Sequence, residues 1–180
     1  MIERVPPQNI EAEQAVIGGM LIEKEAISKV AEFLKADDFY REAHRLIFEA
    51  MLELFNKNEA VDLVTVTEVL RKNDKLEAVG GIAYITSLAN SVPTAANINY
   101  HGKIVEEKAL LRGLINSATH IASMGYEDTE AVTDIIDKAE KMILEVSERK
   151  MSGDFVPIKS IIFDAFGKIE QLYASKGGIT

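Results

Sequence analysis

Histidines and paired acidic residues are the side chains of this sequence whose types suit metal binding or acid–base catalysis. His44, His101 and His120 are scattered along the 180 residues. A zinc or di-iron site on a helix pairs a His with a Glu three or four positions away, and no histidine here has one. We therefore expect all three histidines to be surface or helix-capping residues.

Nucleotide-binding and nucleophile motifs are also missing. The sequence contains no Gly-x-Gly-x-x-Gly, no Gly-x-x-x-x-Gly-Lys-Ser/Thr and no Gly-x-Ser-x-Gly, and it has no cysteine for a disulfide or a thiolate metal site. Acidic pairs such as Asp37-Asp38 and Glu106-Glu107 are commonplace in a chain with 29 acidic residues. We predict no catalytic residue, no cofactor-binding residue and no metal ligand. A carboxylate enzyme stays open only if two perturbed carboxylates share a cleft.

The charge balance argues against direct DNA binding. The chain has 20 basic and 29 acidic residues, a net charge of -9, and an acidic excess in both halves. Tight DNA binding relies on Lys and Arg neutralising phosphates, so an acidic domain should not hold a duplex alone. The longest nonpolar run, Ala15 to Ile22, is far shorter than the ~20 residues that span a bilayer, and no secretory signal is present. These features predict a cytoplasmic protein with no membrane partner.

Hydrophobic periodicity predicts an all-α fold. A compact head of short helices is expected over residues 1–100, and its first helix follows Pro6-Pro7, with Gln8 or Asn9 near the N-cap. Gly18-Gly19 is expected to interrupt that helix, because another helix packs closely there. Further helices are predicted near residues 24–34, 41–55, 63–73 with Asp62 as N-cap, and 81–91.

A helical hairpin is predicted over residues 101–150. Its arms span about 103–124 and 130–149, and Gly125 is expected to end the first arm. The apolar stripe of the first arm is wider than one partner helix needs, which indicates a second partner that could be another copy of the chain. The residues expected at this inter-subunit face are Leu110, Leu114, Ile121, Val132, Ile136 and Ile143.

A separate amphipathic helix is predicted over residues 158–176, after a flexible joint at 151–157 that includes Gly153. Such a helix must bury its stripe, either on the core of this chain or on another chain or domain. The joint favours docking elsewhere, and the mixed polar face argues against a membrane surface. The residues expected to dock are Ile158, Ile161, Ile162, Ala165, Phe166, Ile169, Leu172 and Tyr173.

Several segments of the chain resemble, in order, the N-terminal region of bacterial replicative DNA helicases of the DnaB family. They are RVPP at 4–7, EAEQAVIG at 11–18, DFY at 38–40 with AHRLIF at 43–48, and GGIAYI at 80–85 followed by IVEE at 104–107. Each segment alone is weak, whereas the ordered set is specific.

The resemblance implies a collar in which N-terminal domains pair through the hairpins as a trimer of dimers above a hexameric motor ring. It implies a linker helix that docks on the motor domain of the neighbouring subunit, and a collar that receives primase. The chain stops before the RecA-like motor domain, so ATP, Mg and single-stranded DNA are expected to belong to that missing domain. The expected whole is an ATP-dependent 5'-3' helicase at the replication fork, of which this fragment would have no activity of its own.

A free-standing helical adaptor, such as a helicase loader or primosome scaffold, is the alternative. In that case, the amphipathic helix would bind a separate protein.

Overall fold

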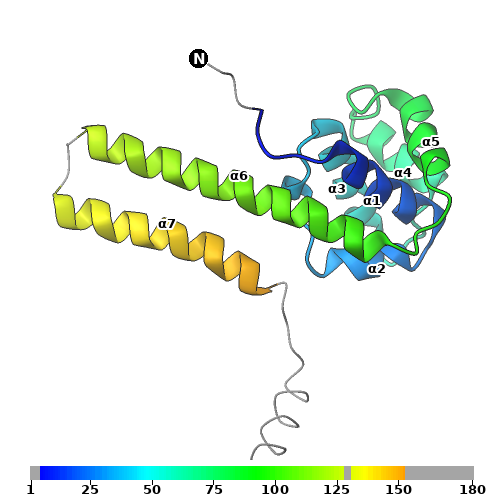
Figure 1. Cartoon of the computed structure of the whole chain (residues 1–180). Helices are drawn as coiled ribbons and strands as arrows, with labels where there is room; N and C mark the ends of the chain where they lie inside the picture. Colours follow the sequence, from blue (N-terminus) through cyan, green and yellow to red (C-terminus); the bar gives the residue numbers. More distant parts are fainter. Residues whose placement is uncertain (1–4, 128–130, 153–180) are drawn as a thin grey trace, which may run out of the picture.

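The computed structural model describes residues 5–127 and 131–152, and every regular element within them is helical (Figure 1). The expected all-α fold is confirmed. The elements are α1 (Ile10–Ile22), α2 (Ala26–Ala31), the 3-10 turn η1 (Ala36–Asp38), α3 (Glu42–Asn56), α4 (Leu63–Lys72), α5 (Gly81–Ser91), α6 (Ile98–Glu127) and α7 (Val132–Ser152). No helix in these ranges is both long and apolar enough to cross a membrane. The predicted helix 158–176 lies outside the described residues.

Helix α1 begins where the sequence predicts, because the side chain of Asn9 accepts a hydrogen bond from the backbone N–H of Ala12 at 2.9 Å. The predicted interruption at Gly18-Gly19 is wrong, since α1 continues through both glycines. The expected close packing is present: a Cβ on Gly18 would lie 2.4 Å from the backbone oxygen of Leu88 in α5. The glycine therefore permits contact between helices without breaking its own.

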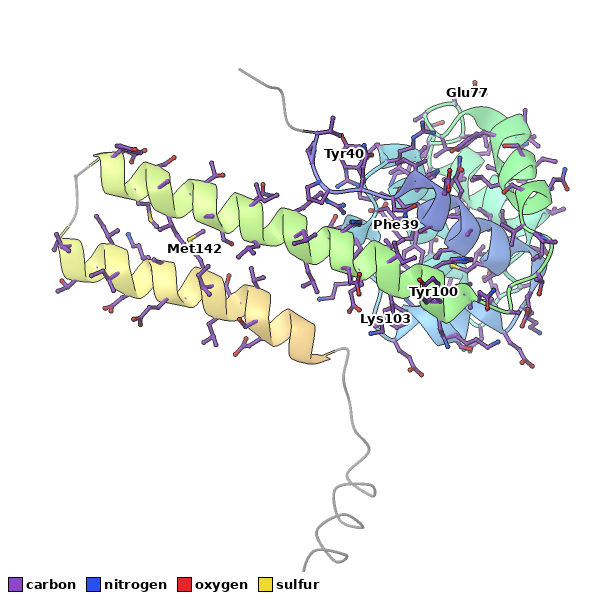
Figure 2. All side chains as sticks on the ribbon, in the orientation of Figure 1. Phe39, Tyr40, Glu77, Tyr100, Lys103 and Met142 are labelled. Atoms are coloured by element: carbon purple, nitrogen blue, oxygen red, sulfur yellow. The ribbon has the colours of Figure 1, made fainter. Side chains whose placement is uncertain are left out.

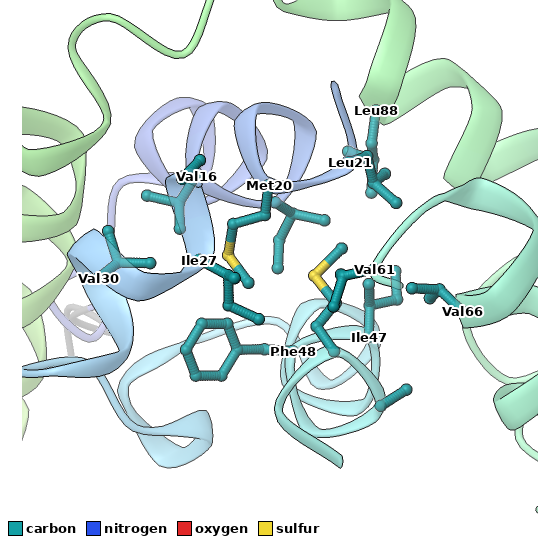
Figure 3. Packing of buried hydrophobic residues seen from close by; sticks show 14 of the residues in the cluster. Val16, Met20, Leu21, Ile27, Val30, Ile47, Phe48, Val61, Val66 and Leu88 are labelled. Atoms are coloured by element: carbon teal, nitrogen blue, oxygen red, sulfur yellow. The ribbon is translucent and has the colours of Figure 1, made fainter. Parts of the chain in front are cut away.

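The head encloses one hydrophobic core beneath α1 (Figure 3). Val16 and Met20 of α1 meet Ile27 of α2 and Phe48 of α3 there, and all four side chains are buried. Burial of such side chains stabilises the fold by about 1.5–3 kcal/mol each. The head therefore has a core of its own.

The remaining helices of the head begin close to the predicted positions. Asp62 caps α4 by accepting hydrogen bonds from the N–H groups of Val64 at 2.9 Å and Thr65 at 3.0 Å. Helix α5 has the predicted bounds. Helix α2 is shorter than the predicted 24–34, since it ends at Ala31.

Helix α6 is the longest element and extends out of the head, as Figure 1 shows. It starts at Ile98, earlier than predicted, and its first turns are buried in the head as far as Ala109. It also continues through Gly125, so the predicted stop there is wrong. A glycine inside a helix costs only about 1 kcal/mol, and Gly125 lacks the positive φ of a helix stop. Helix α7 likewise continues through Met151 and Ser152, which were expected in the joint.

Candidate interaction surface on the helical hairpin

Helices α6 and α7 run antiparallel and share a seam inside the chain. Leu110, Gly113 and Ser117 of α6 line it from one side, and Met142 and Val146 of α7 line it from the other. Figure 2 shows Met142 between the two helices. These side chains recur every three or four positions, which is the spacing that keeps residues on one face of a helix. The seam consumes only part of the apolar surface of each helix.

A second apolar face of the hairpin is exposed, and we call it the bare face. At about 100° per residue, its α6 members lie roughly a quarter-turn or more from the seam, and so do its α7 members. Because the helices are antiparallel, rotation in the same sense brings both sets to the same side of the hairpin. The exposed members, with exposed fractions of 40–67%, are Leu111, Leu114, Ile115, Val132, Ile136 and Ile143.

A groove of about 510 Å³ follows this face between the two helices. Leu111 and Leu114 line it from α6, and Val146 and Ser147 line it from α7. A second hollow of about 440 Å³ lies along α7 beside Ile143 and Leu144. The half of the face nearer the head is therefore furrowed, which suits side chains of another helix pair.

The residues predicted for the inter-subunit face divide into two groups. Leu114, Val132, Ile136 and Ile143 are exposed on the bare face. Leu110 and Ile121 are half-buried, and Leu110 also lines the seam. Leu111 and Ile115 belong to the same face but were not singled out, although the width of the α6 stripe already pointed to them.

Leu144 is exposed as well, and no periodic signal predicted it because it lies outside the α7 stripe.

The base of the hairpin is fixed to the head by Arg112. Its guanidinium donates hydrogen bonds to the backbone oxygens of Pro7, at 2.7 Å, and of Asp38, and it lies 5.8 Å from the centroid of the Tyr40 ring. Burial lowers the pKa of Arg112 below its ordinary value, while the nearby Glu13 charge acts in the opposite direction. One side chain thus ties α6 to the N-terminal segment and to η1.

A buried polar network joins three helices inside the head. Glu13 of α1 is 1% exposed and accepts hydrogen bonds from the backbone N–H groups of Tyr40 at 2.6 Å and Arg41 at 3.3 Å. His44 of α3 contacts the same carboxylate at 2.7 Å through Nδ1, and its Nε2 lies 2.8 Å from the hydroxyl of Tyr84 in α5. The prediction that His44 is a surface or capping residue is therefore wrong.

His101 is half-buried and His120 is exposed. Within residues 5–127 and 131–152, no group of three or more His, Asp or Glu side chains could hold a metal ion.

The fold defines a class of all-helical proteins in which a globular head continues into a helical hairpin with an exposed apolar face. The chain belongs to the DnaB-like helicase N-terminal domain family, which matches residues 5–107. The resemblance that the ordered segments predicted is confirmed.

Two curated relatives that the chain resembles are longer than the chain itself. It is 52% identical over 178 residues to "Replicative DNA helicase DnaC" of Bacillus subtilis and 48% identical over 178 residues to "Replicative DNA helicase DnaB" of Geobacillus stearothermophilus. Each alignment covers 99% of this chain and 39% of the relative. The chain thus spans about two-fifths of the length of these relatives.

Two solved structures share the fold. The crystal structure of the N-terminal domain of DnaB helicase from Mycobacterium tuberculosis matches with a TM-score of 0.76 at 42% identity, over 78% of this chain and 99% of that one. A structure of a DnaB-like replicative helicase and its interactions with primase matches with a TM-score of 0.68 at 29% identity, over 91% of this chain and 36% of that one.

Proposed function

We propose that this chain is the collar of a hexameric replicative DNA helicase, and that it pairs subunits and recruits primase. The observation that carries the proposal is the bare apolar face of the hairpin, in a domain whose relatives are replicative helicases. In the whole protein, a motor domain would bind ATP, Mg and single-stranded DNA and unwind duplex DNA in the 5'-3' direction in the cytoplasm. The head, residues 1–100, and the hairpin, residues 101–150, are the parts that would form the collar.

Pairing of two hairpins would cover the apolar face. Two antiparallel helix pairs that meet face to face form a four-helix bundle, in which apolar residues from all four helices share one core. Leu111, Leu114 and Ile136 are 44%, 44% and 51% exposed, so each would lose a large part of its remaining contact with water. Burial of apolar surface supplies about 25 cal/mol per Å² toward association.

Sedimentation equilibrium on a matched pair of variants tests the pairing. Val132 on the hairpin face and Val64 on the head are 67% and 70% exposed, and each lies in the first turn of its helix. An Asp at either position suits the helix dipole, so neither change should unfold the chain. We expect Val132→Asp to weaken the dimer and Val64→Asp to leave it unchanged. A wild-type chain that stays monomeric across micromolar concentrations would contradict the proposal.

Primase recruitment is supported by the similarity to the solved structure of a DnaB-like replicative helicase that is described with its interactions with primase. Titration calorimetry of this chain with the C-terminal domain of the cognate primase is the direct measurement. We expect saturable binding by the wild-type chain. Absence of heat at concentrations well above micromolar would remove the recruitment role while leaving the pairing intact.

The predicted linker helix completes the proposal. After the joint at 151–157, residues 158–176 would dock on the motor domain of a neighbouring subunit through the stripe that includes Phe166. In the full-length protein, Phe166→Asp should destabilise the hexamer by ~2 kcal/mol or more, because it removes apolar burial and places a charge in the contact. Native mass spectrometry would measure this, and an unchanged hexamer would exclude the docking.

A further inference from the structure

A small groove lies where the hairpin leaves the head. It has a volume of about 380 Å³, and its lining combines the N-terminal segment, the loop before α3 and helix α6. Its apolar lining consists of Val5, Pro6, Pro7 and Ile115, and Tyr40 lies at the edge of the head beside α6 (Figure 2). The volume is near the lower end of the ~300–1,000 Å³ that ligand pockets occupy. The groove therefore has room for one or two residues of a ligand and not for a helix.

The polar lining of the groove comes from Arg112 and Asn116 of α6. They are four positions apart, so they lie one above the other on the same flank of the helix. At about 100° per residue, that flank is turned away from Leu110, which lines the seam, and from Leu114 on the bare face. The groove is therefore separate from the surface proposed for pairing, except at Ile115, which belongs to both.

The guanidinium of Arg112 has hydrogen-bonding capacity left for a ligand. It carries five N–H donors, and within the described residues it donates to two backbone oxygens, those of Pro7 and Asp38, so three donors remain. The amide of Asn116, which is exposed, adds further donors at the rim. A guanidinium fork of this kind matches the geometry of a carboxylate.

The charge of Arg112 is half-buried, and among residues 5–127 and 131–152 no carboxylate forms an ion pair with it. Burial lowers the pKa of Arg112, because the guanidinium has lost part of its hydration. The charge of Glu13 acts on it through space, but the Glu13 oxygens accept hydrogen bonds from Tyr40 and Arg41 and contact His44 instead. A hydrogen-bonded anion in the groove would supply the missing partner.

We infer that the groove binds the carboxyl terminus of a partner protein whose last residue is apolar. The α-carboxylate accepts hydrogen bonds from Arg112 and Asn116, and the last side chain packs on Tyr40 and the two prolines. A carboxyl terminus combines an anion and an apolar side chain in one residue, which is what a small groove with a guanidinium beside an apolar lining fits. An internal Asp or Glu of a partner would place its charge at Arg112 but leave the apolar lining in water.

Fluorescence anisotropy with two synthetic peptides tests the inference. The probe is Gly-Ser-Gly-Ala-Leu-Phe with fluorescein at its amino terminus and a free carboxyl terminus, and the control is the same peptide ending in an amide. Neither has an acidic side chain, which limits general repulsion by a chain of net charge -9. We expect amidation to weaken the affinity about tenfold or more, because it removes the charge that Arg112 binds. Equal affinities, or no saturable binding of the free acid below about 1 mM, would overturn the inference.

Asn116→Asp locates the binding within the chain. The change is close to isosteric at an exposed position, so the chain should fold, and it places a negative charge beside the carboxylate of the ligand. We expect the affinity for the free acid to fall about tenfold or more. Asn99→Asp is the matched control, because Asn99 is an exposed residue of the same helix about 25 Å away, and it should leave the affinity unchanged. An equal response of the two variants would place the peptide elsewhere and overturn the inference.

The groove and the pairing of hairpins can be measured separately. Val132→Asp, which is expected to weaken the dimer, lies outside the groove lining and should bind the free acid as the wild-type chain does. A chain that is monomeric by sedimentation but prefers the free acid keeps this inference and contradicts the pairing. A dimeric chain that binds the acid and the amide equally overturns this inference alone.

Discussion

The Nδ1 atom of His44 lies 2.7 Å from Oε2 of Glu13, and both side chains are buried. A carboxylate can only accept, so Nδ1 carries the proton and donates it to Glu13. The opposite ring nitrogen, Nε2, lies 2.8 Å from the hydroxyl oxygen of Tyr84. These contacts link α5 through α3 to α1, and they end on a carboxylate that also accepts hydrogen bonds from the backbone N–H groups of Tyr40 and Arg41, just before α3.

Glu13→Gln should destabilise the chain by about 2–4 kcal/mol. A glutamine has one acceptor oxygen where Glu13 has two, so its NH₂ group would face an N–H donor in a buried site. Urea denaturation followed by circular dichroism measures the loss. Glu11→Gln, an exposed change on the same helix, serves as control and should cost less than about 1 kcal/mol. Equal effects of the two changes would show that the buried network contributes nothing specific.

Gly18→Ala should destabilise the chain by about 1–3 kcal/mol, because the new Cβ would lie 2.4 Å from a backbone oxygen that cannot move without shifting α5. Gly113→Ala is the matched change in α6, where the nearest atom, in Val146, lies at 4.0 Å. There the added methyl should stabilise by about 0.5–1 kcal/mol through helix propensity. Thermal unfolding distinguishes them, and a neutral Gly18→Ala would refute the close approach of α1 and α5.

Local sequence signals predicted the fold well where the cause is local. The N-caps at Asn9 and Asp62 and the bounds of α5 depend on residues a few positions apart, and the structure confirms them. Helix ends set by packing were missed. Gly125 is a residue that often ends a helix, but α6 continues through it, and no atom of another segment lies within 4 Å of a Cβ built at this position.

Contacts between distant parts of the chain left no local signal. Glu13 and His44 are separated by 31 positions, and Arg112 and Pro7 by 105. The sequence around His44 therefore predicted a surface position for a residue that is buried, because tertiary packing supplies its partner Glu13. The exposed hairpin face, in contrast, could be predicted from the sequence. The apolar stripe of α6 is wider than one partner helix needs, and the width of such a stripe follows from the spacing of apolar residues within the helix itself.

Leu110→Ala and Leu114→Ala should separate the seam from the bare face. Leu110 lines the seam with α7, so its truncation should destabilise the single chain by about 1–2 kcal/mol. Leu114 is 44% exposed, so its truncation should leave the melting temperature of dilute protein nearly unchanged and weaken the dimer. Thermal melts at submicromolar concentration, with sedimentation at higher concentration, measure both quantities. If Leu110→Ala instead weakened only the dimer and Leu114→Ala destabilised the single chain, then Leu110 would face the second copy and Leu114 would face α7.

Arg112→Lys should loosen the base of the hairpin although it keeps the charge. An ammonium cannot reproduce the planar fork that reaches two carbonyl oxygens on different segments, so about one hydrogen bond, or roughly 1–2 kcal/mol, is lost. Hydrogen exchange should then quicken at the amides of Gln8 and Asn9, which follow Pro7, more than in α3. Arg45→Lys is the control: Arg45 is exposed, and its hydrogen bond to Glu42 raises its pKa, whereas burial lowers the pKa of Arg112. That exposed pair should contribute less than about 1 kcal/mol. Unchanged exchange in Arg112→Lys would show that the packing of α6 alone holds the hairpin to the head.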